Sequence, residues 1–317
     1  MKLAIVIDPI THLKLAKDTS LAMLHRAQQL GWETVFFTAD DLVCRDGQAF
    51  AQVYSMQLPQ LDIQFVPEII GLGETALTDF DIILMRKDPP FNNEYIYLTY
   101  ALELAEKQGV LVANKPQSLR DANEKFFTLQ FPQCCPPTVV SKNIQVLKNF
   151  WHQHQNVIYK PLAGMGGASV FHVDTDGNNL SVILEVLTQS QQVTIMGQRY
   201  IPEITESGDK RILLVCGKPV AYGLARIPQP GEFRGNLAVG GLGKVVPLTD
   251  RDRWICKQIG PYLLEKGLYF VGLDVIGEYL TEINVTSPTC AREIMHATNL
   301  DIIGDFLTTL AQKVHKR

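Results

Sequence analysis

A glycine-rich turn in the middle of the chain constrains the fold most, because short apolar runs typical of β-strands flank it on both sides. Residues 157–160 run into Gly164, Gly166 and Gly167, and a second strand-like segment, 168–173, leaves the turn. A P-loop differs, because there the glycine turn opens a helix. We therefore expect a β-hairpin whose loop backbone can closely approach an anion such as phosphate. The alternative interpretation is a flexible surface hairpin.

Lysines accompany this turn. Lys160 ends the first strand and would add a point charge beside a polyphosphate. Lys125 falls in a half-apolar segment, 121–129, for which we predict a helix. Alone, Lys125 would be interpreted as a surface lysine, and only its association with the glycine turn suggests a site.

A pair of strands near the C-terminus carries hard oxygen ligands. In 281–284 the alternation of a strand puts Glu282 and Asn284 on one face, about 7 Å apart. Asp274, in the apolar run 272–276, lies on the neighbouring strand and can complete the cluster. Such a set suits Mg²⁺ that is otherwise held by water and nucleotide phosphates. Polar groups that merely cap a hairpin are the alternative.

Composition excludes several classes of function. The 317 residues are 46% hydrophobic and 20% charged with a net charge of −4, so nucleic acid and acidic membrane surfaces are not expected partners. No apolar run approaches the length of a membrane span, and the chain begins directly with a predicted strand rather than a signal peptide. The six cysteines show no metal-ligand or disulfide spacing, which predicts reduced thiols and a cytoplasmic protein.

Two domains are expected. In the first, strands at 2–8, 33–38, 80–86 and 109–114 alternate with helices at 21–30 and 94–108, which indicates a doubly wound α/β domain. The pattern changes after Asn114, so we place the boundaries at 1–122 and 123–317. Ligands of such sheets bind beyond the carboxyl ends of the strands, where Arg86 lies. The first strand is not followed by a dinucleotide fingerprint.

Further candidates lie between and beyond these elements. The strand end before Pro202 can offer main-chain groups to an adenine edge, although an ordinary strand end is the alternative. A strand begins at 209–211, and its inward-facing basic side chain could reach the γ-phosphate oxygens of a nucleotide. The loop 226–243 has five glycines and resembles a mobile lid, with a disordered crossover as the alternative. Hydroxyl and N–H groups of 286–293, which we expect to open the final helix, can hold an anion. Cys290 is interpreted as a pocket wall rather than a nucleophile. The candidate residues are Gln198, Arg199, Tyr200 and Ile201; Lys210 and Arg211; Arg226, Arg234 and Asn236; and Ser287 and Arg292.

These motifs together resemble the ATP-grasp superfamily and, more closely, the bacterial glutathione synthetases. The resemblance extends almost from end to end and includes the segments 85–91, 114–121, 160–169, 224–241 and 270–292. It implies an N-terminal pre-ATP-grasp domain, an ATP-grasp domain, and ATP-dependent ligation of γ-glutamylcysteine to glycine. An acyl phosphate forms in that reaction, ADP and phosphate are released, and no protein nucleophile is needed. A homotetramer is also implied.

The resemblance assigns roles residue by residue. Lys125, Lys160 and the turn Gly164–Gly167 match the phosphate-binding groups, and the segment from Gln198 to Ile201 matches the adenine hinge. Glu282 and Asn284, assisted by Asp274, match the Mg²⁺ ligands, with Mn²⁺ as a possible substitute. Arg211 matches a positively charged residue near the transferred phosphate. Arg226, Arg234 and Asn236 match residues of the lid that contact the substrate, and Arg86 matches a residue that binds a substrate carboxylate. Many ATP-grasp hinges carry an acidic residue near Gln198 or Arg199, and neither is acidic here.

Two other functions stay open at this point. Another ATP-grasp ligase, such as one that joins D-alanines or modifies a small peptide, would keep most of these motifs. A non-catalytic ATP-binding module, as in synapsin-like proteins, would tolerate the loss of a metal ligand or a lid arginine. In this chain every such position is filled.

Overall fold

The first apolar run is a central strand of a seven-stranded sheet. β1 (Lys2–Val6) pairs in parallel with β2 (Glu33–Phe37) and β6 (Ile82–Met85), and β7 (Leu111–Ala113) pairs in parallel with β6. The computed structural model describes residues 1–317 except 16, 59–66, 165, 230–234, 236–240 and 317. Within the described residues the strand order is β3-β4-β2-β1-β6-β7, with β5 paired to β4.

Helices cover both faces of this sheet, because its central strands are apolar on both sides. Ala4 and Val6 share a core with α2 (Asn93–Lys107), whereas Leu3 and Ile5 share another with α1 (Thr19–Gln29) and α9 (Ile302–Val314). Asp18 caps α1 by accepting a hydrogen bond from the Leu21 N–H at 2.7 Å. The predicted α/β class and doubly wound arrangement are confirmed. The antiparallel extension of the sheet was not predicted; its strands are β3 (Leu42–Arg45), β4 (Gln48–Met56) and β5 (Ile69–Ala76).

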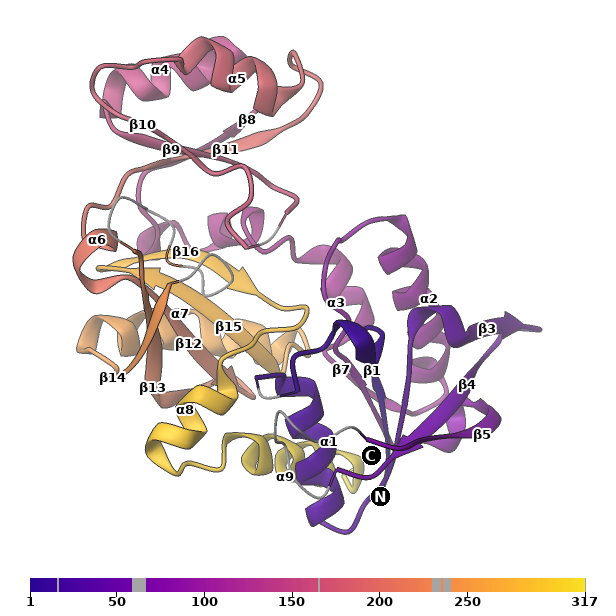
Figure 1. Cartoon of the computed structure of the whole chain (residues 1–317). Helices are drawn as coiled ribbons and strands as arrows, with labels where there is room; N and C mark the ends of the chain where they lie inside the picture. Colours follow the sequence, from indigo (N-terminus) through magenta and orange to yellow (C-terminus); the bar gives the residue numbers. More distant parts are fainter. Residues whose placement is uncertain (16, 59–66, 165, 230–234, 236–240, 317) are drawn as a thin grey trace.

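A second, smaller sheet carries the glycine turn. Its order is β10-β9-β11-β8, all antiparallel, and α4 and α5 pack on one of its faces through Leu147, Leu184 and Tyr159. In Figure 1 this module projects from the rest of the molecule. The elements are β8 (Thr138–Ser141), α4 (Ile144–His154), β9 (Val157–Pro161), β10 (Phe171–Val173), α5 (Leu180–Thr188) and β11 (Ile195–Arg199).

A third sheet carries the acidic strands, in the antiparallel order β14-β13-β12-β15-β16. One face packs on α7, where Ile212 and Leu214 meet Ile255 and Ile259. The opposite face carries Arg211 and is open to the cavities described below. The elements are α6 (Ile204–Ser207), β12 (Asp209–Val215), β13 (Lys218–Ile227), β14 (Leu242–Pro247), α7 (Asp250–Glu265), β15 (Phe270–Ile276), β16 (Tyr279–Asn284) and α8 (Ala291–Thr298).

One buried asparagine joins the first and third sheets. Asn114, directly after β7, donates through Nδ2 to the carbonyls of Phe270 (2.9 Å) and Val285 (2.7 Å). Its Oδ1 accepts from the N–H groups of Tyr269 and Phe270. All the hydrogen-bonding capacity of this amide is used, which fixes the two sheets relative to each other.

Several connections contain short helical segments. α3 (Pro116–Asp121) follows Asn114, and 3₁₀ turns occur at η1 (Ile10–His12), η2 (Ala39–Asp41), η3 (Leu77–Asp79), η4 (Phe126–Gln130) and η5 (Pro132–Cys134).

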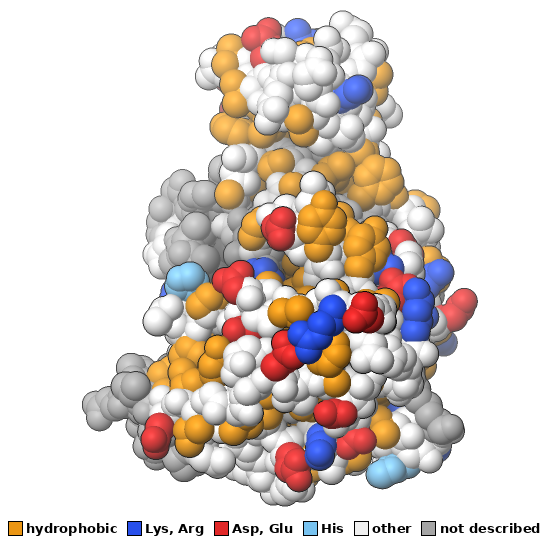
Figure 2. Space-filling view, turned by 90° about the vertical axis from the view of Figure 1, so that its right-hand side faces the viewer, with side chains coloured by type: hydrophobic (Ala, Val, Ile, Leu, Met, Phe, Trp, Pro, Cys, Tyr) orange, Lys and Arg blue, Asp and Glu red, His pale blue; other side chains and the backbone are white. Residues whose placement is uncertain are grey.

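On the face shown in Figure 2, Lys and Arg side chains alternate with Asp and Glu, without a broad basic region. Within the described part of the chain, no helix combines the length and apolarity needed to cross a bilayer.

Candidate functional site

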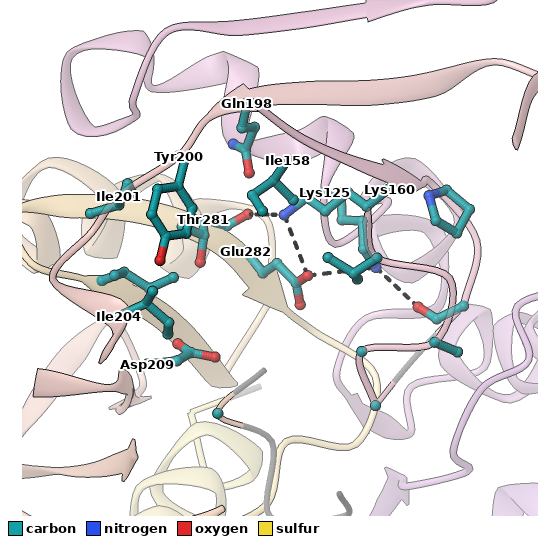
Figure 3. Close-up of a pocket in the computed structure, with 18 of the residues that line it drawn as sticks. Lys125, Ile158, Lys160, Gln198, Tyr200, Ile201, Ile204, Asp209, Thr281 and Glu282 are labelled. Atoms are coloured by element: carbon teal, nitrogen blue, oxygen red, sulfur yellow. Dashed lines mark hydrogen bonds and ion pairs between the residues drawn. The ribbon is translucent and has the colours of Figure 1, made fainter. Parts of the chain in front are cut away.

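Two lysines from different elements converge on one carboxylate. Lys160, at the end of β9, places Nζ 3.6 Å from Oε1 of Glu282 on β16, and Lys125 Nζ lies 3.7 Å from the same oxygen. Lys125 also donates to the Gly164 carbonyl at 3.0 Å. Figure 3 shows both ammonium groups directed at Glu282. Burial lowers the pKa of Lys160, an effect that the Glu282 charge partly offsets; the pKa of Lys125 is raised because Glu282 and Glu124 outweigh its burial.

These lysines line the charged end of a cavity between the second and third sheets, called the hinge cavity here. Gly164, Gly166 and Gly167 border it, and all have positive φ, which suits glycine. On the side away from the lysines, Figure 3 shows Tyr200, Ile201 and Ile204 together with Asp209. Further apolar residues of the cavity wall are Ile158, Pro161, Val170 and Ile276. A flat heterocycle attached to a polyanion matches this division between apolar and cationic ends.

The aromatic wall of the hinge cavity has its own support. The His172 ring stacks on Tyr200 with centroids 4.2 Å apart, and His172 Nε2 lies 2.6 Å from Asn156 Oδ1. The Asn156 carbonyl accepts the Tyr200 N–H at 2.9 Å. Gln198 and Arg199 also line the cavity, so the predicted hinge segment lies together as expected. His172 was not predicted, because a lone histidine on a strand gives no distinguishing pattern.

Asp209 is a further cavity residue that the sequence interpretation did not select. Its side chain is buried, and Oδ1 has no hydrogen-bond partner among the described residues. Burial raises the pKa of Asp209 to about 7, although the nearby Arg226 charge opposes the shift. An unpartnered buried acceptor that faces a cavity is suited to a hydroxyl donor of a ligand.

A second cavity, the arginine cavity, begins where the hinge cavity ends. The two share Gly166 and Glu282. In it, Arg211 donates through Nε to Asp274 Oδ1 at 2.5 Å, and Arg226 Nη2 lies 2.9 Å from Asp274 Oδ2. The two arginines outweigh the effect of burial and hold the pKa of Asp274 below its usual range. Two guanidinium groups beside an open cavity favour carboxylate or phosphate ligands.

The three residues predicted to bind a divalent cation lie on the adjacent strands β15 and β16. Asp274 and Glu282 face each other across the β15–β16 pair, and Asn284 lies opposite Gly272. Asn284 Nδ2 donates to the Gly272 carbonyl at 3.4 Å, so the amide oxygen is the atom that could coordinate a cation. Among the described residues no three His, Cys, Asp or Glu side chains form a metal cluster. A cation at this position would depend on ligand phosphates and water for the rest of its coordination. Glu282 and Asn284 fit such a cation, whereas both Asp274 oxygens are engaged by arginines.

The structure differs from the sequence predictions at several positions. No helix covers 121–129: α3 ends at Asp121, and the Asn123 side chain accepts from the N–H groups of Lys125 and Phe126, which starts a 3₁₀ turn instead. Lys210 points away from both cavities and lies 2.6 Å from Asp252 of α7, because alternation along β12 separates it from Asp209 and Arg211.

Arg292 also lies elsewhere. It donates to the Leu15 carbonyl and borders a separate surface cavity near α1. The helix that it begins, α8, is not the final one, because α9 follows.

The remaining predicted residues surround the arginine cavity. Ser287 lines it, and its hydroxyl bonds the buried Asp88 carboxylate. Arg86 lies behind this wall, where it donates to Ser20 Oγ and to the Pro288 carbonyl at 2.9 Å; its Nη1 has no partner within the described residues. Cys290 is buried in the cavity wall, as predicted. Arg234 and Asn236 lie outside the described residues.

Comparisons with known proteins agree on one family. The model of the prokaryotic glutathione synthetase N-terminal domain matches residues 1–120, and that of the prokaryotic glutathione synthetase ATP-grasp domain matches residues 124–299. The chain is 51% identical to the glutathione synthetase of Pseudomonas aeruginosa, with 100% of this chain and 99% of that protein covered. It is 53% identical to the Escherichia coli (strain K12) glutathione synthetase, over 93% of this chain and 92% of that one.

Solved structures show the same fold at low sequence identity. The D-cycloserine synthetase DcsG superimposes with a TM-score of 0.69 at 12% identity, covering 99% of this chain and all of that one. The D-alanyl-alanine synthetase A of Vibrio cholerae superimposes with a TM-score of 0.61 at 10% identity, covering 100% of this chain and 98% of that one.

Proposed function

The chain belongs to the prokaryotic glutathione synthetase family, and from this premise we propose how its described residues join γ-glutamylcysteine to glycine at the cost of ATP. It is an ATP-grasp ligase that forms glutathione. One observation carries the residue assignments: the hinge cavity and the arginine cavity meet at Glu282 and Gly166. A phosphoryl donor in the first cavity and a carboxylate acceptor in the second would therefore meet at the same point.

In this proposal the hinge cavity takes ATP. The adenine lies among the apolar residues beside Tyr200 and Ile201, with main-chain contacts from the segment 198–201. Asp209 Oδ1 is placed to accept from a ribose hydroxyl, since it is buried and faces the cavity. Lys125, Lys160 and the glycine turn hold the phosphates, as their convergence at the charged end suggests.

Enzymes of this family use a divalent metal with ATP. We assign Glu282 and Asn284 as ligands of Mg²⁺, with Mn²⁺ as a substitute, and retain Asp274 as an assisting residue. The metal would neutralise phosphate charge. Without a metal, Lys125 and Lys160 compensate the charge of Glu282, because both ammonium groups lie close to its Oε1.

The arginine cavity takes γ-glutamylcysteine. An oxygen of its cysteinyl carboxylate attacks the γ-phosphorus, the bond to the ADP oxygen breaks, and the resulting acyl phosphate is attacked by the glycine amine with loss of phosphate. Arg211 and Arg226 are oriented by Asp274 toward the developing charge. Ser287 contributes to the wall, and Arg86 stabilises it through the Pro288 carbonyl rather than by reaching into the cavity. Arg234 and Asn236 are retained as predicted lid contacts that would exclude water.

We also propose a division of the chain into two domains. We assign 1–122 as the substrate-binding domain and 123–317 as the catalytic domain, with α9 of the latter packed against α1. A homotetramer and a cytoplasmic location stay predictions. Lys210 and Arg292 are not proposed as site residues, because their side chains are directed away from the two cavities.

The test is ADP release from ATP and Mg²⁺ with γ-glutamylcysteine, measured with and without glycine, and with the product identified by mass. Glycine-dependent ADP and a glutathione mass are expected. ADP release only with two D-alanines or a peptide would retain the fold but overturn the substrate assignment. Nucleotide binding without turnover for any pair would favour a non-catalytic module.

A further inference from the structure

A third cavity, the side cavity, adjoins the point where the first two meet. It shares Pro89, Glu124 and Thr286 with the arginine cavity and Gly164 with the hinge cavity. The rest of its wall is small or apolar and is formed by Phe91, Ala122, Asn123, Leu162, Ala163 and Val285. Glu124 therefore borders both the side cavity and the arginine cavity, and it is not among the lining residues of the hinge cavity.

Glu124 occupies the junction of the side and arginine cavities. Its backbone is fixed, because its carbonyl accepts the Ile283 N–H of β16 at 2.8 Å. Its Oε1 accepts from Lys125 Nζ at 2.5 Å, which connects it to the lysine that we assign to the phosphates. The side chain is only 17% exposed, so the carboxylate is largely desolvated. Burial, followed by the charge of Glu282, raises the pKa of Glu124, which makes it a better proton acceptor than an exposed carboxylate.

The chemistry of ligation also requires a proton acceptor for the attacking amine. The amine that attacks an acyl phosphate is an ammonium ion near neutral pH and must lose a proton before its lone pair can form the C–N bond. Among the other carboxylates of the arginine cavity, Asp274 is held by two arginines, Glu282 lies between two lysines, and Asp88 accepts from Ser287. Glu124 is a carboxylate at the junction through which the side cavity opens into the arginine cavity.

We propose that the side cavity admits the small amine acceptor and that Glu124 accepts its proton as the amine attacks the acyl carbon. This inference rests on the proposed function. In the step, the ammonium group passes one proton to the Glu124 carboxylate, and the nitrogen lone pair that this frees forms the C–N bond to the acyl carbon. A second N–H proton leaves with the departing phosphate as the amide forms. The carbon–oxygen bond to phosphate breaks, phosphate leaves, and the proton on Glu124 returns to water. The ligand class is a primary amine with little or no side chain, for which glycine fits.

The experiment compares two acceptors in Glu124→Gln. Hydroxylamine is neutral at neutral pH, so it traps an acyl phosphate as a hydroxamate without a protein base. With glycine, the variant is expected to release ADP about 10²–10⁴-fold more slowly than the wild type, the usual contribution of a general base. With hydroxylamine its rate should stay within a few-fold of the wild type, because glutamine retains the oxygen that accepts from Lys125.

A matched control separates this role from an effect on ATP. Asp209→Asn alters a carboxylate of the hinge cavity and should slow both reactions by the same factor. Equal loss of both reactions in Glu124→Gln would overturn the proposal, because Glu124 would then act only through Lys125; an unchanged glycine rate would overturn it as well. If the wild type released no ADP with γ-glutamylcysteine and either acceptor, the proposed function itself would fail instead.

The entry path is tested independently at Phe91, whose ring contacts Tyr95 at a centroid distance of 5.0 Å and which lines only the side cavity among the three. Phe91→Ala widens this cavity. The ratio of kcat/KM for L-alanine to that for glycine should rise about tenfold, the lower range for one methylene in a pocket. An unchanged ratio, with the variant folded by circular dichroism, would contradict entry through the side cavity.

Discussion

Lys160 Nζ lies 3.6 Å from Glu282 Oε1, although the two residues belong to different sheets. The contact brings the end of β9 against the third sheet at the place where the hinge and arginine cavities meet. Lys125 reaches the same oxygen from a third segment. Glu282 therefore lies where the proposed nucleotide site and the proposed dipeptide site meet.

Replacing Glu282 should affect the chemistry far more than the fold. Glu282→Ala removes a proposed metal ligand and is expected to lower kcat more than 100-fold, while the melting temperature changes by only a few degrees. The side chain is 24% exposed, so little core volume is lost. The control is Glu278→Ala, an exposed carboxylate at the turn of the same hairpin. Near-wild-type turnover of Glu282→Ala at saturating Mg²⁺ would remove Glu282 from the metal site.

Replacing Lys210 should affect stability, whereas replacing its neighbour Arg211 on β12 should affect catalysis. Lys210→Met leaves the fully buried Asp252 without its cation and is expected to cost about 3 kcal/mol of stability, with kinetic constants unchanged at a temperature where the variant is folded. Arg211→Met should instead lower kcat, because this guanidinium lines the arginine cavity. Urea unfolding and steady-state kinetics on both variants separate the effects. A kcat defect in Lys210→Met would return that lysine to the site.

The support behind Tyr200 should be visible in ATP binding alone. His172→Ala removes the ring stacked on Tyr200 and is expected to raise KM for ATP by up to about tenfold, the value of one aromatic pair. KM for γ-glutamylcysteine should not change. His172→Phe retains a ring and should restore most of the affinity. If the dipeptide KM rose instead, Tyr200 would not be part of the adenine wall.

Asp209 should give the ligand-free protein a distinctive pH dependence. Its pKa is raised from 3.8 to about 7, so the folded protein retains a proton there that the unfolded chain has already lost. Between pH 4 and 7 this residue therefore makes stability fall as pH rises, and the effect is complete above pH 7. Asp209→Asn mimics the protonated form, so its stability relative to the wild type should increase across that range in urea unfolding measured from pH 4 to 8. A constant difference would contradict the shift.

Much of the fold was predictable because its signals are local. The strand at 2–6 is apolar, and the helices predicted at 21–30 and 94–108 correspond to α1 and α2, so periodicity located these elements. The extension formed by β3, β4 and β5 was missed, because polar residues and glycines interrupt the alternation in β5 and the pairing is antiparallel at an edge.

The placement of Glu282 and Asn284 on one face of a strand was predictable from the alternation within β16, whereas contacts between distant segments were not predictable. Glu124 and Asp209 have no sequence pattern of their own; their importance comes from lying beside Lys125 and Arg226 in the folded chain. Lys210 was misassigned because a run of charges was interpreted without regard to the strand alternation that directs it toward α7. Tertiary contacts between separate elements decide these roles.

In the proposed reaction, a carboxylate in the arginine cavity is phosphorylated by ATP from the hinge cavity. The direct test uses γ-glutamylcysteine labelled with ¹⁸O in the cysteinyl carboxylate, incubated with ATP, Mg²⁺ and glycine. We expect glutathione together with inorganic phosphate that carries one ¹⁸O atom, because the carboxylate oxygen attacks the γ-phosphorus and leaves with it. Glutathione formed with unlabelled phosphate would contradict an acyl phosphate and the site described here.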